Sequence, residues 1–70
     1  RLPIMYARIA LALSPRDKTD RLEREKVVAL IDRFETIARK ARVARVREGG
    51  PLASLDAWLK YARDGAAKLH

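Results

Sequence analysis

The sequence predicts an all-α fold: a small open three-helix arrangement whose long central amphipathic helix forms a helical hairpin with an antiparallel C-terminal helix. Two apolar stripes at three-and-four spacing predict this fold, and Gly49-Gly50-Pro51 separates them. A third apolar segment comes first in the chain. Because 70 residues suffice for one small domain, we treat residues 1–70 as a single helical domain or a fragment of a longer protein.

The leading apolar segment, residues 1–13, is expected to form a helix. Residues 9–13 alternate large and small apolar side chains as a strand would, whereas Met5, Ile9 and Leu13 follow the spacing of one helix face. We favour the helix because alanine is a good helix former and no second strand is available for pairing. The segment is too short to span a membrane, which takes about 20 apolar residues, and Arg8 interrupts it.

The central helix is expected over residues 15–48. Ser14 can cap it and Pro15 suits its first position, while Asp20 with Glu23 offers an alternative start one turn later. Its apolar stripe consists of Val27, Leu30, Ile31, Phe34, Ile37, Ala38, Ala41 and Ala44. We interpret this stripe as a face that packs on a core, with a coiled coil as the alternative.

The C-terminal helix is expected over residues 54–69, after a turn at Gly49-Gly50-Pro51 that ends the central helix. Ser54 can cap the new helix. Its stripe consists of Leu55, Trp58, Leu59, Ala62, Ala66 and Leu69. Gly65 weakens the helix by about 1 kcal/mol relative to alanine, so it either admits a close neighbour or is a tolerated defect.

The two stripes should pack against each other, with Trp58 and Leu59 beside Ile37, Ala38 and Ala41. At 1.5 Å per residue, the central helix over 20–48 would be roughly 43 Å long and the last helix only about 22 Å. Apolar surface would therefore stay uncovered, which favours self-association or docking to a larger protein. The residues expected in the core or the interface are Ile9, Leu13, Leu30, Phe34, Ile37, Trp58 and Leu59.

The composition argues against catalysis and against bound metals or cofactors. The chain has no cysteine and one histidine, at its last position, so disulfide bonds, zinc sites and histidine-activated nucleophiles are not expected. The carboxylates alternate with basic residues as on a solvated face, and no phosphate-binding loop is present. We predict a non-enzyme with no catalytic, cofactor or metal site. The missing cysteines fit a reducing compartment such as the cytoplasm.

The positive charge is local. Residues 14–38 and 48–70 each balance acidic and basic side chains, so the net charge of +7 comes from Arg1, Arg8 and a basic stretch. That stretch consists of Arg39, Lys40, Arg42, Arg45 and Arg47. On one helix, the seven-residue spacing of Arg33, Lys40 and Arg47 would form a basic ridge suited to a phosphate backbone. The alternative is a solvated helix end that complements the macrodipole.

These observations favour a non-enzymatic protein-interaction module, an accessory or regulatory part of a larger assembly that binds a second copy of itself or a larger protein. The alternative is a helical nucleic-acid-binding domain that contacts the phosphate backbone. The chain contains no asparagine or glutamine for reading adenine, so contacts would be to backbone more than to bases. A membrane-surface role is least supported, because the basic and the most apolar residues lie on different elements.

Overall fold

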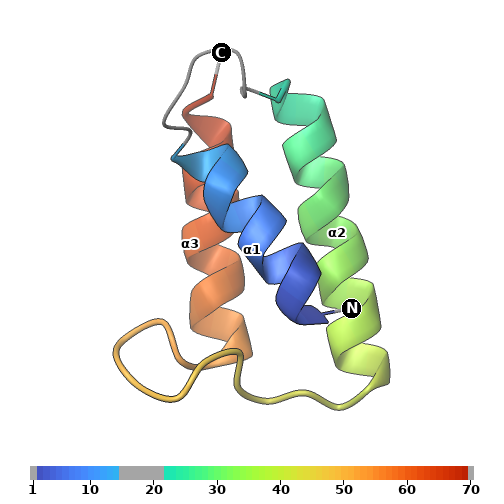
Figure 1. The fold of residues 1–70 in the computed structure, drawn as a ribbon, viewed down its shortest axis with the longest axis vertical. Helices are drawn as coiled ribbons and strands as arrows, with labels where there is room; N and C mark the ends of the chain where they lie inside the picture. Colours follow the sequence, from blue (N-terminus) through green and yellow to red (C-terminus); the bar gives the residue numbers. More distant parts are fainter. Residues whose placement is uncertain (1, 15–21, 70) are drawn as a thin grey trace.

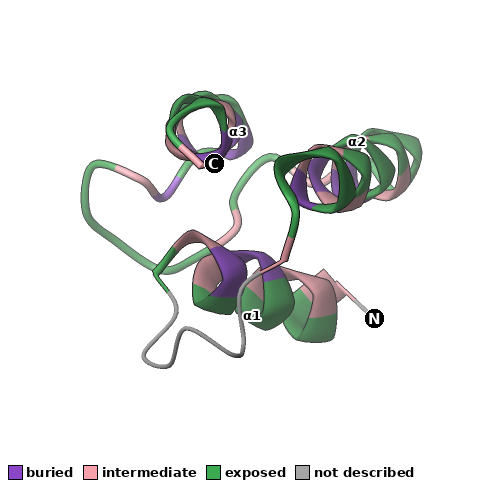
Figure 2. Cartoon of the chain, turned by 90° about the horizontal axis from the view of Figure 1, so that it is seen from above, coloured by how far each residue is buried: buried purple, intermediate pink, exposed green. Residues whose placement is uncertain are grey.

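The computed structural model describes residues 2–14 and 22–69 and contains the three helices α1 (Leu2–Leu13), α2 (Arg24–Lys40) and α3 (Leu55–Ala67) (Figure 1). The all-α class and the helical hairpin are confirmed, because α2 and α3 run antiparallel side by side (Figure 1). Helix α1 crosses one face of this pair and packs on both helices (Figure 2).

Helix α1 settles the choice between helix and strand for the leading segment in favour of the helix. Its inner face supplies Ile9 and Ala12 to the core, while Ile4 and Leu11 face outward. Its last turn lies against α3, since a Cβ atom added at Gly65 would stand 3.0 Å from the Leu13 Cδ2 atom. Gly65 therefore admits a close neighbour, the Leu13 side chain, as one of its two predicted roles required; the other was a tolerated defect.

Helix α2 begins at Arg24, with Glu23 in an extended conformation at the N-cap and no side-chain cap there. The predicted start at Pro15, and the alternative at Asp20, lie outside the described residues, but Leu22 and Glu23 are not helical, so the prediction of one continuous helix through them is wrong. The central part of the predicted stripe is confirmed, because Val27, Ile31, Phe34 and Ala38 are all buried.

The carboxyl end of the central helix differs from the prediction: α2 ends at Lys40 and not at residue 48. Arg42 turns the chain out of the helix with a φ of 57°, the left-handed region that usually belongs to glycine at such ends. The Val43 amide donates to the Ala38 carbonyl at 2.8 Å and the Arg42 amide to the Arg39 carbonyl at 3.0 Å, the two bonds of a Schellman motif. Ala41 and Ala44, expected on the stripe, are exposed.

The connection over residues 41–54 returns to the hairpin through a short antiparallel pairing. Arg45 and Ser54 form an isolated β-bridge. The Val46 amide donates to the Ala53 carbonyl at 2.7 Å, and the Leu55 amide to the Ala44 carbonyl at 2.9 Å. Gly50, with a φ of 89°, and Pro51 lie in a turn at the tip of this connection, not at the end of α2.

Helix α3 begins as predicted, because the Ser54 hydroxyl accepts a hydrogen bond from the Ala57 amide at 3.2 Å. Because α2 begins at Arg24 and ends at Lys40, it has 17 residues, whereas α3 has 13. At 1.5 Å per residue, the two helices are about 25 Å and about 20 Å long. Val43, Val46 and Leu52 of the connection pack on the core. The large length mismatch expected between the two hairpin helices is thereby mostly removed.

Candidate interaction surfaces

Most residues predicted for the core or interface are internal. Ile9, Phe34, Trp58 and Leu59 are buried, and together they join all three helices in one cluster. Leu13 and Leu30 are half-buried and pack against this cluster, whereas Ile37 is half-buried and is not part of it. The prediction thus identified six packing residues, and Leu13, Leu30 and Ile37 also reach the surface.

An aromatic stack joins α1 to α3. The Trp58 ring contacts two aromatic neighbours: Tyr6 of α1, at a centroid distance of 4.4 Å, and Tyr61 on its own helix, at 5.5 Å. Tyr61 is 47% exposed, so this side of the aromatic group reaches the surface. The buried Trp58 Nε1 has no hydrogen-bond partner among the described residues. The buried Trp58 ring contributes apolar area to the core.

A network of five charged side chains ties α2 to α3. The Arg63 guanidinium donates to Asp32 at 2.8 Å and also to Glu35. Arg39 donates to Glu35 at 2.8 Å and to Asp56 at 3.0 Å. Because all five residues lie on the hairpin helices, the network links α2 to α3 on the solvent side of the pair.

Glu35 stands at the centre of this network. Hydrogen bonds from Arg39 and then from Arg63 lower the pKa of the Glu35 carboxyl below its usual value. The pKa values of Arg39 and Arg63 are raised, first by hydrogen bonds to Glu35 and to Asp32 respectively. These shifts favour the charged forms of Glu35, Arg39 and Arg63.

The predicted basic ridge does not form on one helix. Lys40 is the last residue of α2, whereas Arg42, Arg45 and Arg47 lie in the connection that follows. Arg39 is held by two carboxylates of the hairpin network. The single helical ridge is therefore wrong, because α2 ends before it can be completed. Contact of these five basic residues with an anion stays a prediction.

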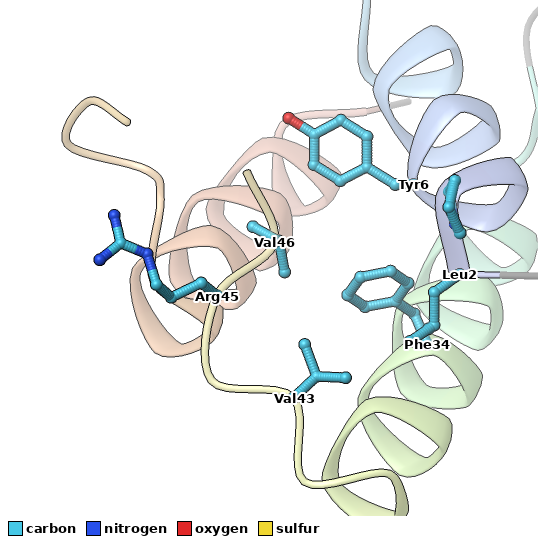
Figure 3. Close-up of a pocket in the computed structure, with 7 residues that line it drawn as sticks. Leu2, Tyr6, Phe34, Val43, Arg45 and Val46 are labelled. Atoms are coloured by element: carbon cyan, nitrogen blue, oxygen red, sulfur yellow. The ribbon is translucent and has the colours of Figure 1, made fainter. Parts of the chain in front are cut away.

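A pocket of about 300 Å³ opens where the start of α1, the middle of α2 and the connection meet (Figure 3). Its lining is mostly apolar and consists of Leu2, Pro3, Tyr6, Phe34, Val43, Arg45 and Val46. The Arg45 guanidinium points away from Phe34 in this view (Figure 3). The pocket therefore offers apolar contact and no charged group directed inward.

The outward face of α1 is the most apolar exposed surface among the described residues. Ile4 is 66% exposed and Leu11 is 53% exposed, the two largest values for large hydrophobic residues there. Pro3, Ala7 and Arg8 complete this face, which surrounds a shallow hollow of about 380 Å³. We call these five residues the α1 outer face.

The α1 outer face is not among the predicted surfaces, although the sequence carries a signal for it. An amphipathic helix on a surface carries polar residues on its outer side, but Leu2–Leu13 has Arg8 and Tyr6 as its only polar side chains. A helix that is apolar on nearly all sides is typical of a buried position. In this fold, α1 covers the hairpin with one side only.

The described residues hold no group of three or more metal-binding side chains, and none of the described helices is long and apolar enough to cross a bilayer. Comparison with known proteins gives no match: no family model, no curated protein and no solved structure is similar to the chain. The function therefore has to follow from the chemistry of the two candidate surfaces. These are the exposed apolar face of α1 and the basic connection after α2.

Proposed function

We propose that the protein is a non-enzymatic helical interaction module, an accessory or regulatory part of a larger assembly. It docks through the α1 outer face on a second copy of itself or on a larger protein. The observation that carries this proposal is the exposure of Ile4 and Leu11 on a helix whose other side already packs on the core.

The free energy available from covering this face supports the proposal. Burying a fully exposed isoleucine or leucine side chain is worth about 1.5–3 kcal/mol, and both residues are more than half exposed. Pro3 and Ala7 add apolar area beside them without charge. A partner that covers this face would also stabilise a 70-residue domain, whose own core is small.

Contact with a nucleic-acid backbone is the second candidate, and the connection after α2 favours it. Lys40, Arg42, Arg45 and Arg47 are exposed, and none of them forms an ion pair with another described residue. Since Arg39 is already paired, at most four of the five predicted contacts remain free. Four phosphate contacts to duplex DNA would give a salt slope of about −3.6.

Solution mass separates the two candidates. Light scattering on the free chain should give a dimer or larger species if the partner is a second copy. In that case Leu11→Glu should return the monomer mass, while Ala44→Glu, which adds the same charge at an exposed position of the connection, should leave the assembly intact. An assembly that persists in the Leu11→Glu variant would exclude the α1 outer face as the contact.

The same measurement with duplex DNA at low and moderate salt tests the second candidate. A complex that dissociates as salt rises would support backbone contact. Arg42→Glu with Arg45→Glu should then abolish it, and Lys60→Glu with Lys68→Glu serves as the charge-matched control on α3. Equal losses in both variants would show that only net charge matters, which contradicts a site on the connection.

A further inference from the structure

The surface beside the α1 outer face is a groove between α1 and α2. Two hollows share Arg8, Leu30 and Arg33, so they adjoin each other and together form a depression along the two helices. One hollow measures about 350 Å³ and reaches Ile37, and the other measures about 300 Å³ and reaches Leu22. We call this depression the α1–α2 groove.

The groove has an apolar floor and a basic rim. Met5, Leu30 and Ile37 are half-buried hydrophobic residues in the first hollow, and each still exposes apolar area. Arg8, Lys26 and Arg33 are exposed along the edges. Within residues 2–14 and 22–69, none of these three cations pairs with a carboxylate, unlike Arg39 and Arg63 on the hairpin.

We propose that the α1–α2 groove binds an acidic amphipathic helix of a partner protein, an inference that rests on the proposed function. A groove between two packed helices with an apolar floor suits the apolar stripe of a third helix, whose anchors recur at three-and-four spacing. Carboxylates flanking that stripe would meet Arg8, Lys26 and Arg33 at the rim, which speeds association and fixes the orientation of the partner.

A second copy of this chain fits the groove less well than an acidic partner. Each copy carries a net charge of +7, so two copies repel each other. The most apolar exposed helix that a second copy could insert is α1, and Arg8 lies in the middle of its outer face. Insertion would bring that arginine against the basic rim of the groove, and like charges in contact are unfavourable.

Selection from a displayed library of random 16-residue peptides, with the whole chain as bait, tests the proposal. We expect the enriched peptides to combine leucine-type anchors at helical spacing with several glutamate or aspartate residues. Isothermal titration calorimetry with one enriched peptide should show affinity that falls as salt rises. Enriched peptides without acidic residues would overturn the proposal.

Two double variants of equal charge then locate the site. Lys26→Glu with Arg33→Glu reverses the part of the rim that lies outside the α1 outer face, and it should weaken peptide binding at least tenfold, since it replaces attraction by repulsion. Arg45→Glu with Arg47→Glu makes the same charge change on the connection and should alter the affinity less than twofold. Circular dichroism checks that both variants keep their helicity, and Ile4→Glu, at a highly exposed wall of the groove, should also weaken binding.

The outcomes separate this proposal from the proposed function. Equal weakening by both double variants would overturn the groove as the binding site. If binding is lost only on Leu11→Glu and not on reversal of the rim, the domain is an interaction module but its partner does not use the groove. If the library yields no binder, the groove proposal fails, and if the chain is also monomeric by light scattering, self-association through the α1 outer face fails as well.

Discussion

At the scale of single residues, Arg42 makes the decisive turn in the chain. It adopts a φ of 57° at the end of α2 without being glycine. A residue with a side chain is strained there by about 1–2 kcal/mol, because its Cβ atom approaches the following carbonyl oxygen. The bond from the Val43 amide to the Ala38 carbonyl and the packing of Val43 on the core offset this strain.

Arg42→Gly should therefore raise the free energy of unfolding, by about 0.5–1 kcal/mol after the greater flexibility of glycine in the unfolded chain is subtracted. Urea denaturation followed by circular dichroism measures the change. Arg47→Gly is the matched control, since it removes the same charge at a residue without positive φ, and it should be neutral or destabilising. Equal effects of the two changes would assign the gain to charge and not to backbone strain.

Glu35 makes the stability of the protein sensitive to acid. Its pKa is lower in the folded state than in the unfolded chain, because Arg39 and Arg63 hydrogen-bond to it. The stabilisation is complete above the unfolded pKa and is lost as pH falls through the folded pKa. Glu35→Gln should destabilise the protein at pH 7 and reduce the difference in unfolding free energy between pH 7 and pH 3. An unchanged difference would remove Glu35 from this role.

At the scale of elements, the contact of α1 with α3 gives a reason for a glycine within α3, at position 65. Gly65→Ala improves helix propensity by about 0.8–1 kcal/mol, but the new methyl group would meet the Leu13 side chain at 3.0 Å. We expect the single change to be close to neutral, because Leu13 must shift to admit the methyl group.

A double-mutant cycle checks this explanation. In the background of Leu13→Ala, Gly65→Ala should stabilise the protein by nearly the full helix propensity, since the space is then open. Thermal denaturation of the four proteins gives the coupling between the two sites. A coupling energy near zero would mean that Leu13 does not restrict residue 65.

Elements with local signals were predictable from the sequence. The cap residue Ser54 and the apolar stripe after it predicted the position of α3. The alanines of the leading segment predicted that α1 is a helix. The end of α2 had no such signal, because arginine, the residue at position 42, is not a type associated with positive φ. Glycine is such a type, and it occurs only later, at Gly49 and Gly50. The helix ends where Val43 and Val46 gain packing on the core, and that gain depends on α1 and α3 being in place. The periodicity of apolar residues within one segment cannot show where packing against other helices ends that segment's helix.

At the scale of the whole molecule, one small core holds three helices, so a single internal change should affect all of them. Phe34 is 2% exposed and also lines the pocket between α1, α2 and the connection. Phe34→Ala should cost about 3–5 kcal/mol, which is comparable to the total stability of many small domains. We expect a cooperative loss of helicity by circular dichroism, with Tyr61→Ala as a milder comparison. Retained helicity would remove Phe34 from the core.

The candidate surfaces depend on whole-molecule geometry more than on local pattern. The packing residues Ile9, Phe34, Trp58 and Leu59 could be predicted, since burial follows from the stripes. The α1–α2 groove could not, because it depends on the angle at which α1 crosses the hairpin. The basic ridge failed for the same reason, since it required a helix that tertiary packing ends at Lys40.

The stack of Tyr6 on Trp58 gives the protein an intrinsic optical reporter. Trp58 is the only tryptophan in the chain, and its closest aromatic neighbour belongs to a different helix at 4.4 Å. Undocking of α1 would admit water to the indole and shift its emission to longer wavelength, even while α2 and α3 stay paired. Tryptophan fluorescence and circular dichroism recorded together would therefore distinguish release of the first helix from unfolding of the hairpin.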